Sequence, residues 1–230
     1  MQRKIIITAD GSKTIHLPEW DEQYHSKHGA IQEALHVFIN AGLIHFHDKE
    51  SIQNISILEM GFGTGLNAYL TLLEASKSNV IIDYVGVEAY PVNSEEIKEL
   101  NYPKVVIDNK QDELFDVLHT ISWETKHHVN ASFALTKRKQ FFEYVDEVDT
   151  YNLIYFDAFG ARVQPELWTE DIFKKMYDAL EPNGVLVTYS AKGSVRRALQ
   201  SVGFEVERLQ GPPGKREMLR ATKHFEKPIK

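Results

Sequence analysis

The segment that most constrains the fold is Glu59–Asn67, which reads Glu-Met-Gly-Phe-Gly-Thr-Gly-Leu-Asn. It follows a short apolar run at 55–58, and the spacing of Leu66, Leu70 and Leu73 after it predicts the buried face of a helix. A strand, a glycine-rich turn and a helix in this order let the backbone approach a nucleotide-like ligand. The dinucleotide fingerprint would require glycine where Leu66 stands, so the spacing disfavours a dinucleotide oxidoreductase.

The next predicted strand, 81–88, ends in Glu88, whose carboxylate can hold both hydroxyls of a ribose. An acid that ends the strand before a glycine turn, followed by an acid that ends the next strand, resembles the class I S-adenosylmethionine (SAM) methyltransferases. The alternative is a purely structural turn, and the presence of Glu88 favours ligand binding.

Strand and helix patterns alternate along the rest of the chain. This alternation predicts an α/β fold with a Rossmann-like, doubly wound sheet that ends in an antiparallel strand pair. We expect residues 1–50 to form a short N-terminal extension with a hairpin and a helix, and residues 51–230 to form a SAM-dependent methyltransferase domain. The predicted strands are 55–59, 81–88, 129–135, 151–156, 185–189, 204–209 and 217–222, with a hairpin at 4–16; the predicted helices are 30–44, 66–76, 111–122, 165–180 and 193–201, with another beginning after Asn93.

Composition limits the remaining classes. The chain has 230 residues and no cysteine, which excludes disulfides and thiolate metal sites. No apolar run approaches the ~18 residues of a membrane span, so we expect no membrane partner and a cytoplasmic location. The net charge of −7 argues against nucleic acid as a partner, but the segment from Lys192 to Lys230 holds ten basic and four acidic residues.

Several further segments resemble one family: the methyltransferase part of the bacterial tRNA wobble-uridine enzyme MnmC and its stand-alone relatives, often called MnmD. They follow the family's order over roughly residues 20–222, and the glycine string together with Gly-Lys-Arg-Glu-Met is the most specific part. The matching pieces are Tyr24-His-Ser26 with Gly29, Glu33 and His36-Val-Phe38, then Glu59–Asn67, Val87-Glu-Ala-Tyr-Pro91, Phe156-Asp-Ala-Phe159, Pro165-Glu-Leu-Trp168, Tyr189-Ser-Ala191, Val195-Arg-Arg197 and Gly214-Lys-Arg-Glu-Met218.

The resemblance implies SAM-dependent N-methylation of the 5-aminomethyl group of wobble (2-thio)uridine in the tRNA anticodon loop, giving 5-methylaminomethyl-(2-thio)uridine. The two-domain relatives add a flavin-dependent oxidase; the chain ends at Lys230, so we expect only the methyl transfer. One alternative is an amine N-methyl- or aminopropyltransferase acting on a small molecule, since spermidine-synthase-like proteins share the glycine turn and an acid at the fourth strand end. Another is a SAM-sensing domain without catalysis. The oligomeric state stays open.

The resemblance also implies a set of cofactor-binding residues. The three glycines let the backbone approach SAM, Asn67 and the first helical turn offer donors to its carboxylate, and the residues of the extension close the site. Relatives tend to carry an acid for adenine after the third strand; here Lys137–Gln140 stands there, so we expect Gln140 or backbone groups to take this role. The full set is Tyr24, Ser26, Glu59, Gly61, Phe62, Gly63, Thr64, Gly65, Asn67, Glu88 and Ala89.

Asp157 follows the predicted strand 151–156, at the edge where open α/β sheets bind ligands. An amine attacks only as the free base, so we expect Asp157 to orient the amine and take its proton. The alternative is a structural carboxylate that caps the following turn. Phe159 and Trp168 are candidates for stacking on the uracil or packing around the sulfonium, although Trp168 also fits a core position.

Four basic residues, Arg196, Arg197, Lys215 and Arg216, are candidates for phosphate contacts, with a solvated surface as the alternative. The pairs His25/His28 and His45/His47 lack matching acids, so we expect no metal site.

Overall fold

The computed structural model describes residues 2–106 and 112–225, and its main feature is a mixed eight-stranded sheet. The strand order is β10-β11-β9-β8-β4-β5-β7-β6. The strands from β9 to β7 in this order are parallel, whereas β6, β10 and β11 pair antiparallel with their neighbours. The predicted doubly wound sheet with a final antiparallel pair is therefore confirmed. The strands are β4 (Asn54–Met60), β5 (Ile81–Val87), β6 (Lys126–His128), β7 (Phe133–Arg138), β8 (Tyr151–Phe156), β9 (Leu180–Thr188), β10 (Glu205–Gln210) and β11 (Glu217–Thr222).

The central strands are apolar on both faces because helices cover both sides of the sheet. In β8 every residue is buried. Leu153 and Tyr155 belong to one core cluster, whereas Ile154 and Phe156 belong to the other. A continuous apolar run thus predicts a central strand.

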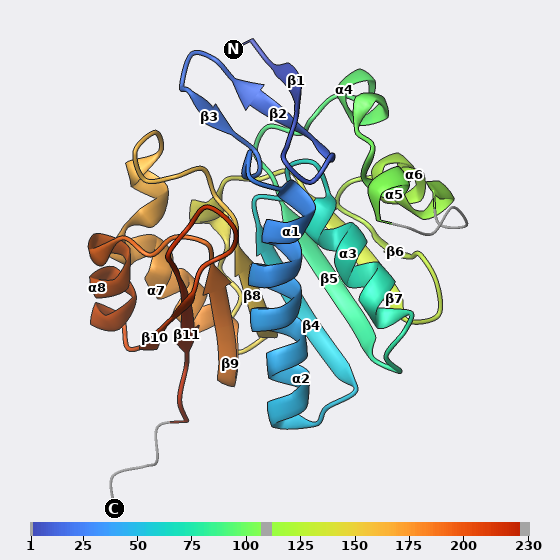
Figure 1. The fold of residues 1–230 in the computed structure, drawn as a ribbon. Helices are drawn as coiled ribbons and strands as arrows, with labels where there is room; N and C mark the ends of the chain where they lie inside the picture. Colours follow the sequence, from blue (N-terminus) through green and yellow to red (C-terminus); the bar gives the residue numbers. More distant parts are fainter. Residues whose placement is uncertain (1, 107–111, 226–230) are drawn as a thin grey trace, which may run out of the picture.

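Helices of the N-terminal half cover one face (Figure 1). The predicted helix 30–44 is observed as a longer continuous unit with a π-helical middle, and it packs on the main sheet. A Cβ at Gly42 would lie 3.1 Å from Val187 and 3.2 Å from Tyr155, so the absence of a side chain permits this close approach. The helices on this side are α1 (Ala30–Ala34), η1 (Leu35–Ile44), α2 (His45–Glu50), α3 (Leu66–Ala75), α5 (Tyr102–Val105) and α6 (Asp112–Thr120).

The second face is covered by α7 (Glu170–Ala179) and α8 (Gly193–Ser201). A further helix, α4 (Ser94–Glu99), begins at the predicted place, where the Asn93 side chain accepts a hydrogen bond from the Glu96 amide. None of the helices in the described residues is long and apolar enough to cross a membrane.

A separate three-stranded sheet is formed by β1 (Lys4–Ile7), β2 (Lys13–Leu17) and β3 (Glu22–Gln23). The predicted hairpin at 4–16 is confirmed, and β3 extends it. Figure 1 shows this small sheet at the upper edge of the main sheet, near the first turn of α1. The predicted domain boundary near residue 50 stays a prediction. The helix of the extension packs in the same hydrophobic core as the main sheet.

Three predicted elements differ from the structure. The strand predicted at 129–135 is observed only from Phe133, where β7 begins, because β6 and β7 flank a turn in which Asn130 accepts from the Ser132 amide. The helix at 165–180 is divided into the 3-10 helix η3 (Pro165–Trp168) and α7, because the Thr169 side chain caps α7. The strand predicted from residue 185 already begins at Leu180. Residue 111 of the predicted helix 111–122 lies outside the described residues.

Candidate active site

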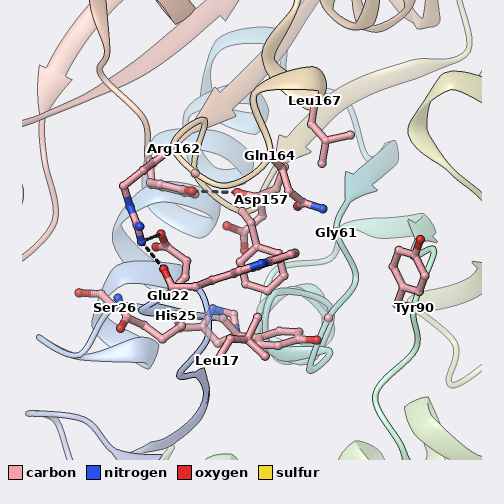
Figure 2. Close-up of a pocket in the computed structure, with 18 of the residues that line it drawn as sticks. Leu17, Glu22, His25, Ser26, Gly61, Tyr90, Asp157, Arg162, Gln164 and Leu167 are labelled. Atoms are coloured by element: carbon pink, nitrogen blue, oxygen red, sulfur yellow. Dashed lines mark hydrogen bonds and ion pairs between the residues drawn. The ribbon is translucent and has the colours of Figure 1, made fainter. Parts of the chain in front are cut away.

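A cavity of about 1230 Å³ opens at the carboxyl ends of β4, β5 and β8, beneath the small sheet. The main sheet contributes Gly61, Glu88 and Asp157 to its lining, and the small sheet contributes Leu17 and Glu22. Figure 2 shows Leu17, Glu22, Gly61 and Asp157 around one space, with Tyr90 at one side. Ligands of open α/β sheets bind at this edge.

The glycine turn brings bare backbone to the cavity wall. Gly61 has φ 100°, and a Cβ there would lie 2.6 Å from the Asp157 carbonyl oxygen. Gly63 has φ 49°, and its Cβ would lie 3.1 Å from the Tyr24 ring. The amides of Gly61 and Phe62 donate to the Val87 carbonyl at 3.0 and 2.9 Å. The turn is thus fixed between β5 and β8, in a conformation that favours glycine.

Glu88 stands at the end of β5 and ties two loops together. Its carboxylate accepts from the Gly63 amide at 3.0 Å and from the Tyr90 amide at 2.8 Å. Both Glu88 and Ala89 line the cavity. The acid thus fixes the glycine turn and faces the cavity at the same time.

Asn67, in the first turn of α3, bridges two carboxyl groups. Its amide donates to Glu59 Oε1 at 2.9 Å and to Asp157 Oδ2 at 2.8 Å. Burial raises the pKa of Glu59 well above its ordinary value, and the nearby Asp157 carboxylate acts in the same direction. Burial and the Glu33 carboxylate raise the pKa of Asp157 to about 7, against the lowering effects of Asn67 and Lys215.

Several predicted cofactor residues lie behind the cavity wall. Glu59, Thr64 and Asn67 are at most 1% exposed, and Phe62 packs against the Trp123 ring. Thr64 accepts from Tyr102 at 3.1 Å and pairs with His25 at 2.8 Å. Gly65, with φ 71°, is the N-cap of α3. These residues shape the turn, whereas Tyr24, Ser26, Gly61, Gly63, Glu88 and Ala89 line the cavity.

The two predicted aromatic residues differ in position. Phe159 lines the cavity, and its ring packs edge-on against Tyr24 at 4.9 Å and Trp20 at 5.8 Å. Trp168 is only 6% exposed and donates to the Phe159 carbonyl at 2.8 Å. The stacking predicted for Trp168 is therefore corrected: the ring lies in the core and supports Phe159.

The four residues predicted to contact phosphate also differ in position. Arg197 and Arg216 are exposed and Arg196 is half-buried, but none of these three lines the cavity. Lys215 does line it, with its ammonium group 2.6 Å from Glu33 Oε1. Lys215 thus forms an ion pair at the cavity wall, and its predicted phosphate contact stays a prediction.

Other cations of the C-terminal segment have acidic partners as well: Arg208 pairs with Glu217, Arg220 with Glu207 and Lys223 with Asp149. Lys227 and Lys230 lie outside the described residues. Lys27 and Lys192, by contrast, are exposed cavity-lining residues, and no ion pair is found for them within 2–106 and 112–225.

Adenine recognition is the part of the site that the sequence located least well. Gln140 does not line the cavity, and the neighbouring Lys137 is buried, where it donates to the His119 carbonyl. Beyond Glu88 the cavity is lined by Tyr90 and Phe141, whose rings lie 5.9 Å apart at 80°. Phe142 and Glu143 line it too. The sequence signal that could have pointed to Tyr90 is its place in the string Val87–Pro91.

Comparison with known proteins places the chain in a family. A family model described as S-adenosyl-L-methionine-dependent methyltransferase matches residues 110–224, half of the chain, and the chain belongs to this family. It is therefore a SAM-dependent methyltransferase. Across the part of the chain that the structure describes, no group of three or more His, Asp or Glu side chains could hold a metal ion.

The particular relatives carry the name MnmC. The tRNA 5-methylaminomethyl-2-thiouridine biosynthesis bifunctional protein MnmC of Marinomonas sp. is 27% identical over 88% of this chain. This chain spans only 31% of that protein. The crystal structure of MNMC2 from Aquifex aeolicus matches all of this chain and 73% of its own, with 26% identity and a TM-score of 0.79. A spermidine synthase in complex with the analogue AdoDATO, at 16% identity, TM-score 0.57 and coverage of 97% and 71%, shares the fold alone.

The residues at the ends of β4 and β5 fit SAM. Gly61 and Gly63 leave space that a Cβ would fill, and the Glu88 carboxylate lies at the neighbouring strand end. The ring pair Tyr90/Phe141 adds an aromatic wall beyond Glu88.

Replacing Glu88 by alanine tests this fit. The variant loses a cavity carboxylate and the acceptor that holds the Gly63 amide. We expect SAM affinity to fall by about 1.5–3 kcal/mol, the range for hydrogen bonds to a charged group. Isothermal titration calorimetry measures the change, with Glu95→Ala on exposed α4 as the control. Unchanged affinity in Glu88→Ala would remove Glu88 from the cofactor site.

Proposed function

We propose that this chain methylates the 5-aminomethyl group of wobble (2-thio)uridine in the anticodon loop of tRNA, with SAM as the methyl donor. The observation that carries the proposal is Asp157, a carboxylate with a pKa raised to about 7 that faces the cavity beside the glycine turn. Similarity to proteins named MnmC over 88% of the chain supports an amine on this nucleoside as the acceptor.

Proton transfer is the chemical task of the protein. When bound, SAM supplies a methyl group on a positively charged sulfur. The primary amine must be unprotonated to attack: its nitrogen forms the new bond to carbon, the carbon–sulfur bond breaks, and the excess proton on nitrogen passes to Asp157. A carboxylate that titrates near pH 7 is a stronger base than an exposed one and still releases its proton to water afterwards.

The cavity wall also excludes water and positions the base. The rings of Trp20, Tyr24 and Phe159 pack edge to face on the side of the small sheet. A uracil ring entering beside Phe159 would find aromatic faces to stack on. Tyr24 and Ser26 then close the cofactor from the N-terminal side, as the sequence predicts.

The tRNA backbone requires cations at the cavity mouth, because the chain as a whole is acidic. Lys27 and Lys192 are exposed there and come from different parts of the chain. Arg197 and Arg216 remain candidates farther out. Phosphate contacts of this kind fix the orientation of the RNA and leave the base to the cavity.

A direct assay tests the function. Purified protein and SAM are incubated with tRNA that carries 5-aminomethyl-2-thiouridine, and its nucleosides are analysed by mass spectrometry. We expect one methyl group on the wobble nucleoside and none on tRNA that lacks the aminomethyl group. Putrescine with SAM, or with decarboxylated SAM, is the matched small-amine control. Modification of the polyamine and not of the tRNA would establish the small-molecule alternative.

Asp157→Asn tests the proton acceptor. The amide retains the shape but cannot take a proton, so we expect the methylation rate at pH 7 to fall at least tenfold while SAM affinity stays close to wild type. Raising the pH should recover part of the rate, because more of the amine is then deprotonated in solution. Full activity of the variant at pH 7 would make Asp157 a structural carboxylate.

The effect of Lys27 and Lys192 on tRNA binding can be distinguished from the effect of the protein's total charge. We expect Lys27→Ala/Lys192→Ala to weaken tRNA binding and to reduce the log–log salt slope by roughly one unit for each lost phosphate contact. The matched control is Lys174→Ala/Arg208→Ala, which removes the same charge at positions that do not line the cavity. Filter binding between low and high salt gives both slopes. Equal slopes for the two double variants would contradict the assignment.

A further inference from the structure

Lys215 lies in a tight connection between β10 and β11 that directs its side chain inward. The Gly211 amide donates to the Arg216 carbonyl at 3.0 Å, and the Lys215 amide donates to the Pro212 carbonyl at 2.9 Å. Gly214 has φ 84°, and a Cβ there would lie 2.2 Å from the His28 ring. This connection is therefore held against the N-terminal extension.

The Lys215 ammonium group is held by an acid and an aromatic ring. It lies 2.6 Å from Glu33 Oε1 and 3.7 Å from the centre of the Tyr189 ring. The Glu33 side chain is 8% exposed, and its second oxygen accepts from the Ser26 amide at 2.8 Å. Tyr189 in turn donates to the Ala158 carbonyl, next to Asp157, at 2.8 Å. The carboxylate side of this ion pair is buried and the ammonium side is half-buried, and both residues line the cavity that Asp157 lines.

The ionisable groups around Asp157 come from several elements, but few of them carry charge at neutral pH. Burial raises the pKa of each surrounding tyrosine and of Glu59, and burial lowers the pKa of His25 to about 4. The tyrosines and His25 are then uncharged near pH 7, and Glu33 and Lys215 form an ion pair in the cavity wall. Glu22, Glu88 and Arg162 line the same cavity. The groups around Asp157 are Glu33 and His25 from the extension, Glu59 from β4, Tyr84 from β5, Tyr102 from α5, Tyr189 after β9 and Lys215.

We propose that Lys215 is a positioning residue for the methyl transfer: by neutralising Glu33 inside the cavity, it keeps Asp157 in the ionised, proton-accepting form. This inference rests on the proposed role of Asp157. It assigns the lysine of the Gly-Lys-Arg string to the reacting carboxylate and leaves RNA phosphates to other cations. The two partners act in opposite directions, since Glu33 disfavours a second negative charge nearby and Lys215 favours it.

Carboxyl-carbon NMR with labelled aspartate tests the inference directly. The signal missing in Asp157→Asn identifies Asp157, and its titration is followed in the whole chain without SAM or tRNA. We expect Lys215→Met to move the Asp157 midpoint up and Glu33→Gln to move it down, each by about one pH unit, the low end of the range for a neighbouring charge. Arg216→Met, one position along the same connection and exposed, should leave the midpoint in place.

The double variant Glu33→Gln/Lys215→Met removes both charges and nearly keeps their shape. We expect its midpoint to return close to wild type, and it supplies the measurement if Lys215→Met alone does not fold with Glu33 unpaired. Methylation by Lys215→Met at pH 7 should fall roughly fivefold, as follows from a one-unit rise above a pKa of about 7. The lost rate should return at higher pH.

Other roles of Lys215 predict different results. A flatter salt slope for tRNA binding in Lys215→Met would make it a phosphate contact, and a tenfold weaker SAM affinity would make it a cofactor ligand. Either result, or a midpoint that moves in neither single variant, overturns the inference. Because the titration needs no substrate, wild-type protein that fails to methylate tRNA contradicts the proposed function separately.

Discussion

The amide of Asn67 holds the site together, because it donates to two carboxyl groups on different strands. Glu59 lies one residue before the end of β4 and Asp157 directly follows β8, so this one side chain joins the strand before the glycine turn to the strand end that carries Asp157. Two carboxyl groups that share one amide in a desolvated place cannot both ionise easily. Burial is the largest cause that raises the pKa of each, and Asp157 is the one of the two that lines the cavity.

The same geometry explains why the glycine turn matters beyond cofactor binding. Gly61 approaches the Asp157 backbone so closely that any side chain would displace β8 or the turn. Asn67 reaches both acids only because α3 begins at Gly65, in a left-handed conformation. The position of the Asp157 carboxylate and the bare backbone of the glycine turn therefore have one structural origin.

Much of the fold was predictable from local patterns. Strand β8 was placed correctly because six consecutive residues are buried on both faces, and the final strand pair was marked by turn residues at both ends. The errors arose where short-range polar contacts determine where an element begins or ends. Asn130 and Thr169 each accept a backbone amide and so interrupt a strand and a helix that apolar periodicity alone extends.

The site was predictable only in part, for a related reason. Residues at strand ends, such as Glu88 and Asp157, were found because parallel strands bring their carboxyl ends to one edge. Glu33, Tyr90 and Tyr189 lay in recognised strings but had no assigned role, since their positions depend on tertiary packing. Charge counting also overestimated the basic surface of the C-terminal segment, because Arg208, Lys215, Arg220 and Lys223 find acidic partners.

The small sheet forms one wall of the cavity that Asp157 lines. Arg162, after β8, donates to the Trp20 and Asp21 carbonyls and pairs with Glu22, while Arg3 pairs with Glu96 on the opposite side (Figure 2 for Arg162 and Glu22). Burial is the largest cause of the raised pKa of Asp157, and Leu17, Glu22 and Gln23 of the small sheet line the same cavity as this carboxylate. The two arginines thus do more than join an extension to a domain. By keeping the small sheet in place they preserve one wall of the cavity, and under the proposed function this wall helps to keep the carboxylate that would accept the amine proton out of bulk water.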